Sequence, residues 1–160
     1  MVEKTDEELI GTRKWLESIG STLHTETNPS FNWYSAPARN PEFADAPKMF
    51  AFSFKAPTAG QVVAVSTDVP EEFRKYWAIH EFLEEDKPEY AGKCVDTLKE
   101  EIALVPSIVM ARYVPVRAEF FRGLVEYARS VDAYTPEKVK QFALSRDYMN
   151  KLEKDLGGNR

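Results

Sequence analysis

The strongest constraint on the fold is a pair of short apolar runs joined by a connection that contains proline and glycine. In residues 49–55 every second side chain is a phenylalanine, and residues 61–66 are rich in valine. Alternation with a period of two is typical of a strand with one buried face, and a short connection such as residues 56–60 is typical of a hairpin. The sequence therefore predicts an antiparallel hairpin over residues 49–66.

A helix is predicted directly after the hairpin, from about Val69 to Glu85. Asp68 is expected to cap its first turn, and Pro70 occupies an early position where a missing N–H costs nothing. Apolar and aromatic side chains then recur at spacings of three and four, which predicts a broad apolar face. The residues on or beside this face are Phe73, Tyr76, Trp77, Ile79, His80 and Leu83.

The first part of the chain predicts a helix followed by a loop. Thr5 and Glu8 form a capping-box pattern, and an apolar stripe of helical spacing follows them. Residues 21–48 contain four prolines and are predicted to be mostly loop, with residues 22–26 and 31–35 as alternatives for short strands. The stripe of the helix consists of Leu9, Ile10, Trp15, Leu16 and Ile19.

The second half of the chain predicts several helices. Residues 93–105 have helical periodicity, residues 107–114 form a short apolar stretch, and Pro115 is expected to open a further helix. A last helix is expected to start at Pro136 and to end at the glycine pair 157–158.

The predicted fold class is α+β: an N-terminal helix, a small antiparallel sheet with its hairpin at residues 49–66, and a helical C-terminal half. A chain of 160 residues can bury one sizeable core, so a single domain over residues 1–160 is expected. The formal net charge of −5 argues against binding to nucleic acid or to an anionic membrane. The single cysteine, Cys94, excludes an internal disulfide, and no segment has the pattern of a membrane span or a signal peptide. The cytoplasm is the expected compartment.

The predicted helix before residue 85 also carries the most suggestive chemistry. His80 has acidic residues at helical spacing after it. Glu84 lies one turn later on the same side of the helix, whereas Glu81 is turned by about 100°. Because an imidazole and a carboxylate can converge on one ion in this arrangement, His80 and Glu84 are the candidate metal ligands.

The segment Ala78-Ile79-His80-Glu81-Phe82-Leu83-Glu84, placed after a hairpin, resembles the active-site helix of zincin-type metallopeptidases, whose pattern is H-E-x-x-H. The resemblance implies that His80 binds the metal and that Glu81 is the general base of a hydrolase. The position of the second histidine holds Glu84. A histidine and a carboxylate form a harder ligand set, which is weaker for zinc and more acceptable to manganese or iron.

A third ligand must come from elsewhere in the chain. A catalytic zinc has three protein ligands and one open position for water. Glu100, Glu101 and Glu119 are the candidates in the second half of the chain, and His24 is an upstream alternative. Spacing alone does not choose among them.

These residues also have a structural interpretation. A histidine beside aromatic residues is typical of a core position, bonded to a backbone carbonyl or, here, to Glu84. Three arginines form either an anion-binding set or a group of solvent-side charges that pair with Glu119 and Glu126. They are Arg112, Arg117 and Arg122.

Two classes of function follow. The first is a small metal-dependent hydrolase whose exposed sheet edge holds an extended peptide. The second is a non-catalytic domain without metal, which acts through contacts with a protein partner; residues 29–47 and the helices after Pro106 would supply its contact surfaces.

Overall fold

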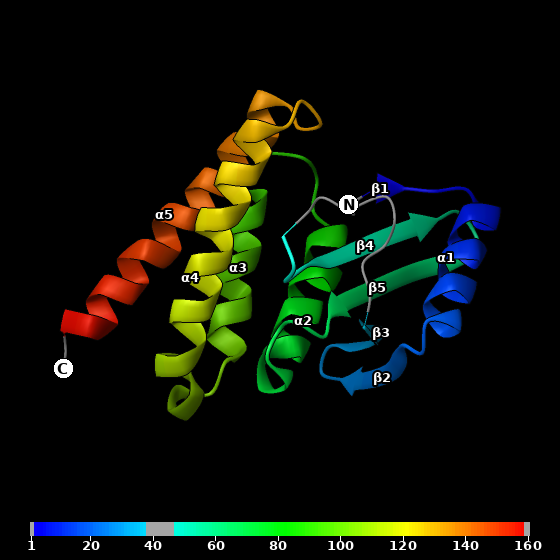
Figure 1. Ribbon diagram of the computed structural model, residues 1–160, viewed down its shortest axis with the longest axis horizontal. Coiled ribbons are helices and arrows are strands. Elements are labelled where there is room, and N and C mark those ends of the chain that lie inside the picture. Colours follow the sequence, from blue (N-terminus) through cyan, green and yellow to red (C-terminus); the bar gives the residue numbers. More distant parts are fainter. Residues whose placement is uncertain (1, 38–46, 159–160) are drawn as a thin grey trace. The chain divides into compact units, whose positions relative to one another are not determined.

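The computed structural model describes residues 2–37 and 47–158, and the chain forms two compact units, residues 1–86 and 87–160. The first unit, called the sheet unit below, contains all the strands and helices α1 and α2 (Figure 1). The second, called the helical unit, contains helices α3 to α5. The predicted α+β class is confirmed, and the expectation of a single domain stays a prediction. No helix of the described residues is long and apolar enough to cross a membrane.

Within residues 2–37 and 47–158, the sheet has five strands in the order β1-β4-β5-β3-β2. The predicted hairpin is confirmed, because β4 and β5 are antiparallel neighbours. The sheet as a whole is mixed, however, since β1 pairs with β4 and β3 pairs with β5 in parallel. The prediction of an antiparallel sheet was wrong at these two seams because the sequence pattern of a strand fixes its faces but not the direction of its neighbour. The strands are β1 (Val2–Glu3), β2 (Thr22–Thr27), β3 (Ser30–Ala36), β4 (Ala51–Ala56) and β5 (Gly60–Ser66).

Residues 22–36 form a second hairpin, which confirms the alternative of short strands at residues 22–26 and 31–35, while the expectation that this segment is mostly loop was wrong. Six successive residue pairs join β2 to β3, from Thr22–Ser35 to Thr27–Ser30. Pro29 lies in the turn between the strands, and Pro37 follows the last residue of β3. The prolines therefore flank the strands without removing a donor from the ladder. Residues 38–46 of the predicted loop lie outside the described residues.

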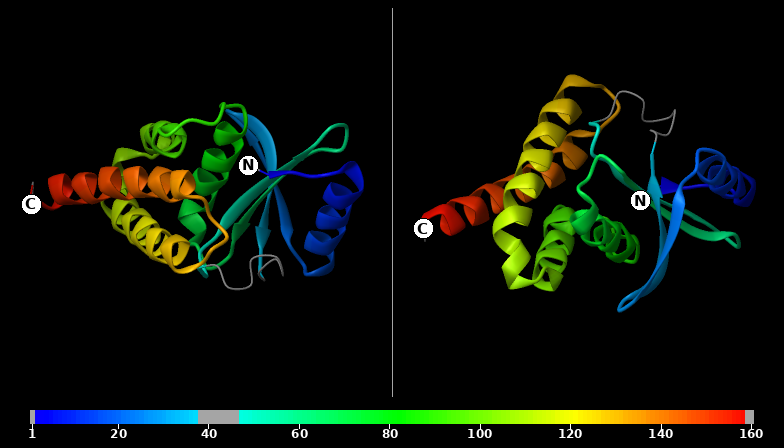
Figure 2. Two further views of the ribbon diagram at one scale, coloured as in Figure 1. Left: turned by 90° about the horizontal axis from the view of Figure 1, so that it is seen from above. Right: turned by 60° about the horizontal axis from the view of Figure 1, so that its bottom comes forward.

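Helices α1 (Asp6–Ser18) and α2 (Arg74–Glu85) lie on opposite faces of the sheet, as Figure 2 shows. Towards α1 the sheet presents one apolar cluster, and towards α2 it presents Phe31, whose ring stacks on Phe82 at 4.5 Å. Lys55 also lies on the α2 side, with its Nζ 3.8 Å from Glu85. The buried members of the α1 cluster are Leu9, Leu16, Ala36, Phe50, Phe52, Phe54, Ala56, Val62 and Ala64.

The start of α1 is fixed by the predicted capping box. The Glu8 amide donates to the Thr5 hydroxyl, and the Thr5 amide donates to the Glu8 carboxylate, both at 3.1 Å. Asp6, the first helical residue, accepts hydrogen bonds from the amides of Thr58 and Ala59 at 2.9 and 2.8 Å. These bonds connect the helix to the turn between β4 and β5.

The start of α2 differs from the prediction. A short 3-10 turn, η2 (Glu71–Phe73), precedes the helix, and Asp68 does not cap it. The Asp68 amide donates to the Ser66 hydroxyl at 3.0 Å, and the Val69 amide donates to the Ser66 carbonyl at 3.1 Å. Asp68 thus takes part in this turn, and among the described residues no side chain caps the first amides of η2 or α2.

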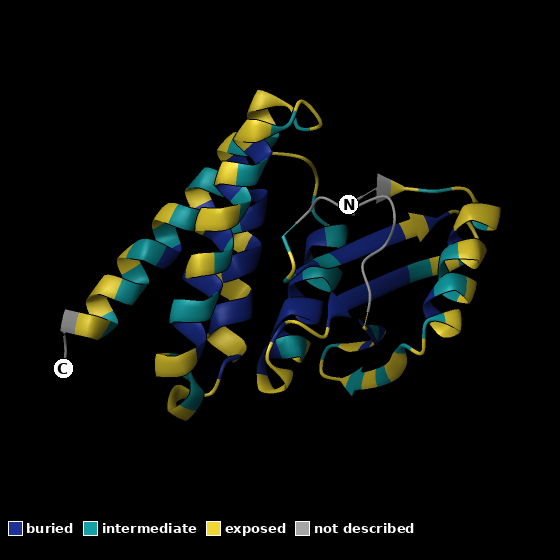
Figure 3. Ribbon diagram, in the orientation of Figure 1, coloured by how far each residue is buried: buried dark blue, intermediate teal, exposed yellow. Residues whose placement is uncertain are grey.

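The helical unit contains α3 (Lys93–Leu104), α4 (Ser107–Ser130) and α5 (Pro136–Gly158). The first and last of these confirm the predicted helices. The expected helix start at Pro115 was wrong, because α4 begins after Pro106 and continues through Pro115. Tyr113 and Val114, just before this proline, are fully buried, so packing offsets the backbone hydrogen bond that a proline cannot donate. Figure 3 shows that exposed and partly exposed residues alternate along most of α5.

Candidate functional site

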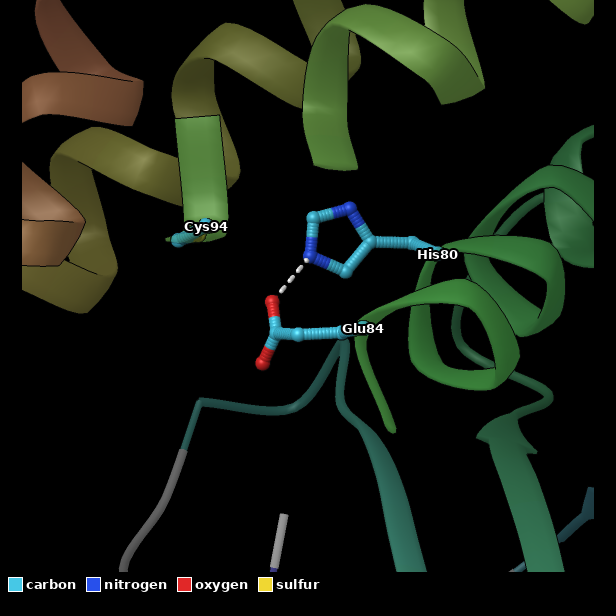
Figure 4. Close-up of side chains that lie close together, drawn as sticks. All are labelled: His80, Glu84 and Cys94. Atoms are coloured by element: carbon cyan, nitrogen blue, oxygen red, sulfur yellow. Dashed lines mark hydrogen bonds and ion pairs between the residues drawn. The ribbon is translucent and has the colours of Figure 1, made fainter. Parts of the chain in front are cut away.

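His80 and Glu84 lie on the side of α2 that points away from the sheet. Phe82 and Glu85 make the contacts with the sheet described above. Because a helix turns by about 100° per residue, the His80 side chain lies about 160° around the axis from Phe82. The Glu84 side chain follows one turn after His80 and points in the same direction (Figure 4). Both residues are buried, with 4% and 9% of their surface exposed.

The two side chains meet in a hydrogen bond. His80 Nε2 lies 2.9 Å from a carboxylate oxygen of Glu84, Oε2. An ionised carboxylate can only accept, so the bond fits a proton on Nε2 that is donated to Glu84. The predicted convergence of this imidazole and this carboxylate is confirmed. Cys94, which Figure 4 also labels, is a residue of the helical unit and is described with it.

The geometry of the pair is close to that of two ligands of one ion. Ligands that bind a metal at about 2.1 Å with an angle between 90° and 109° lie about 3.0 to 3.4 Å apart. The observed separation of 2.9 Å would need only a small change once Nε2 has lost its proton. His80 and Glu84 could therefore contribute two ligands to a divalent ion. Within the described part of the sheet unit, no third histidine, cysteine, aspartate or glutamate completes a set of three donors.

Glu81, the predicted general base, lies on α2 beside this pair. Its side chain is half-buried, and its position is about 100° around the helix from His80. Glu85, unlike Glu81, lies on the sheet side of α2. Burial raises the pKa of the Glu85 carboxyl group, against the lowering effect of Lys55. The proposed role of Glu81 stays a prediction.

The three glutamates named as further ligands all belong to the helical unit. Glu119 is exposed. Glu100, also on the surface, forms an ion pair with Lys87. Glu101 is completely buried and has partners within its own unit.

Glu101 is the centre of a buried charge network. Arg117 donates from Nε and Nη2 to the two carboxylate oxygens of Glu101, at 3.0 and 2.7 Å. The hydroxyl of Tyr113 also donates to this carboxylate. Burial alone would lower the pKa of the Arg117 guanidinium. The adjacent Glu101 carboxylate raises this pKa by more than burial lowers it, so Arg117 stays charged. Its guanidinium also lies over the ring of Phe121, 4.8 Å from the centroid.

The expectation of solvent-side arginines was wrong for Arg117, which is only 3% exposed. Arg122 is on the surface, but it pairs with Glu153 of α5 at 3.1 Å. The helical spacing of the sequence could have indicated that Arg117 and Glu101 are buried, because each occupies a position on the apolar stripe of its helix. Charges of opposite sign at core positions of two helices indicate a buried pair.

The remaining histidine and the cysteine have partners in their own surroundings. His24 on β2 stacks on Trp33 with ring centroids 4.1 Å apart, and its Nε2 lies 2.9 Å from the Ser35 hydroxyl. Trp33 donates from Nε1 to Glu26 at 3.0 Å. Cys94 is buried in the helical unit, where the Ser145 hydroxyl donates to its sulfur at 3.0 Å.

No family model matches the sequence, no curated protein matches it, and no solved structure matches the fold.

Proposed function

We propose that the protein binds a divalent metal ion and that His80 and Glu84 of α2 are two of its ligands. The observation that carries the proposal is the meeting of Nε2 and Oε2 at 2.9 Å on one side of the helix. Two donors fixed on one rigid helix lose little freedom when an ion binds, since the helix already holds them one turn apart. The mixed nitrogen and oxygen donor set favours manganese or iron.

The proposal extends to hydrolysis through Glu81, in line with the zincin-like segment. A divalent ion at such a site makes a bound water easier to deprotonate. Glu81 follows the first ligand directly in sequence and can accept and hold the proton, as a general base must. The substrate class would be peptides or other compounds with a polarised carbonyl group.

The test of metal binding is analysis of protein purified without chelator. We expect the wild type to contain about one equivalent of metal, and His80→Ala and Glu84→Gln to lose it. Adding manganese at about 100 times its dissociation constant should stabilise the wild type by about 2.7 kcal/mol and leave both variants unchanged. His24→Ala and Glu85→Gln are the matched controls and should retain the metal.

Metal-free wild type with no thermal shift would refute the proposal, as would equal metal content in His80→Ala. The role of Glu81 has a separate readout. Glu81→Gln should keep the metal and lower the hydrolysis rate about 100-fold or more. Unchanged hydrolysis in this variant would remove Glu81 from the mechanism and leave metal binding intact.

A second candidate is a non-catalytic domain in which the same pair is structural. The enclosure of His80 and Glu84 favours this candidate, because the hydrogen bond already satisfies one polar atom of each buried side chain. In that case His80→Ala should lower stability by about 1 to 3 kcal/mol with no dependence on metal. Metal titration of the wild type and His80→Ala, followed by the melting temperature, separates the two candidates.

A further inference from the structure

Strand β2 has an outer edge that lacks most of the features that usually protect an edge strand, although it carries one charged residue, Glu26. It is the last strand of the sheet order, and among the described residues no strand pairs with its outer side. Its sequence, Thr22-Leu23-His24-Thr25-Glu26-Thr27, has no proline and no lysine, and its ladder with β3 has no bulge. Leu23 is 54% exposed. Proline, lysine, bulges and short length are the common means of preventing edge pairing.

The other edge of the sheet is different in kind. It is formed by β1, which has only two residues. A strand of that length offers too few backbone groups to form a ladder with another chain. Any strand pairing that extends this sheet is therefore expected at β2.

We propose that β2 pairs with β2 of a second copy of this chain, in antiparallel orientation, about a two-fold axis through Thr25. In antiparallel pairing, opposite residues point to the same face of the sheet. The two-fold axis that relates two identical strands must therefore place one residue opposite its own copy. With the axis at Thr25, His24 lies opposite Glu26 of the other copy, and this pairing occurs twice. Leu23 then lies opposite Thr27.

Hydrogen-bonding complementarity between His24 and Glu26 selects this register over its neighbours. An axis through His24 would place two histidines opposite each other, and an axis through Glu26 would place two carboxylates opposite each other, which is destabilising. Within one chain His24 uses Nε2 to contact Ser35, and Glu26 uses Oε2 to accept from Trp33. Within the described residues, Nδ1 of His24 and Oε1 of Glu26 are then available for the cross-strand pair.

Cysteine trapping tests the pairing and its register together. Directly opposite residues in an antiparallel pair have Cα atoms about 4.5 to 5.5 Å apart, which is within the range that a disulfide spans. Thr25→Cys should therefore form a disulfide-linked dimer under mild oxidation. Leu23→Cys, also at an exposed position, should form a dimer with another Leu23→Cys chain roughly ten-fold more slowly, because residue 23 of one copy lies opposite residue 27 of the other. A mixture of Leu23→Cys and Thr27→Cys should form the mixed dimer.

Wild-type protein, with its buried Cys94, gives the background in non-reducing gels, and circular dichroism of each variant confirms that the fold is retained. Selective linkage of Thr25→Cys, together with light scattering that rises towards the dimer mass with concentration, is the expected result. Equal linkage of Thr25→Cys and Leu23→Cys would show random collision and overturn the proposal. A Thr25→Cys protein that stays monomeric would overturn the proposal as well. That outcome includes the case in which an extended peptide, and not a second copy, pairs with β2.

Discussion

Replacing Glu101 by leucine will remove the carboxylate partner of a guanidinium in the core of the helical unit. Glu101 is 0% exposed and Arg117 is 3% exposed, so neither charge can be compensated by water without opening the helices. The variant loses two charge-assisted hydrogen bonds, at 3.0 and 2.7 Å. Removing one partner of a buried ion pair typically costs about 3 to 5 kcal/mol, a large share of the roughly 5 to 15 kcal/mol that stabilises a domain.

The double variant is the decisive measurement. We expect Glu101→Leu and Arg117→Met each to lower the free energy of unfolding by about 3 to 5 kcal/mol, and the combination to cost much less than their sum, because no isolated buried charge remains. The hydroxyl of Tyr113 also loses an acceptor, so full recovery is not expected. Arg122→Met is the matched control: its ion pair with Glu153 is on the surface and should contribute about 0 to 1 kcal/mol.

Urea unfolding followed by circular dichroism at the helical band reports on this unit, because α3 to α5 contain most of the helical residues. Tryptophan fluorescence reports on the sheet unit, since all three tryptophans, Trp15, Trp33 and Trp77, lie there. Additive losses in the double variant, or single variants within about 1 kcal/mol of the wild type, would refute the reasoning that the two charges depend on each other.

Two further predictions concern Pro115 in the backbone of α4 and the carboxyl group of Asp6. Pro115→Ala restores a donor inside α4 and should raise the free energy of unfolding by about 1 to 3 kcal/mol; an unchanged or lower melting temperature would contradict this expectation. Hydrogen bonds from Thr58 and Ala59 lower the pKa of Asp6 below its ordinary value of 3.8. Its contribution to stability is therefore fully present above pH 3.8 and is lost as the pH falls through the lower, folded-state pKa. Asp6→Asn should flatten the acid side of the stability curve, and an NMR titration that places the Asp6 pKa at or above 3.8 would contradict this assignment.

The elements that the sequence predicted correctly are those that local residues determine. The capping box at Thr5 and Glu8 sits at the start of α1, and the hairpin of β4 and β5 follows from alternation and a short turn. The convergence of His80 and Glu84 was predictable for the same reason, because helix geometry alone brings residues four apart to one side.

The incorrect predictions concern places where packing outweighs a local signal. Pro115 indicated a helix start, but buried side chains on both sides of it hold α4 together. The density of prolines between residues 29 and 47 indicated a loop, although Pro29 and Pro37 only border the strands. Periodicity places Glu101 and Arg117 on the apolar faces of their helices, but that they pair with each other depends on how the two helices pack. The parallel seam of β3 and β5 likewise depends on how two hairpins meet.

Strand β5 has neighbours along both of its edges, and it is buried from Val62 to Ser66. That position explains why Val62, Val63 and Val65 occur in one short stretch without a charge. Uncharged segments rich in β-branched residues and free of proline are also the ones that assemble into intermolecular cross-β structure when a chain unfolds. We therefore expect β5, an interior strand of the native sheet, to be the strand that nucleates aggregation in the unfolded chain. The yield of refolding would then depend on how quickly β5 pairs again with β3 and β4.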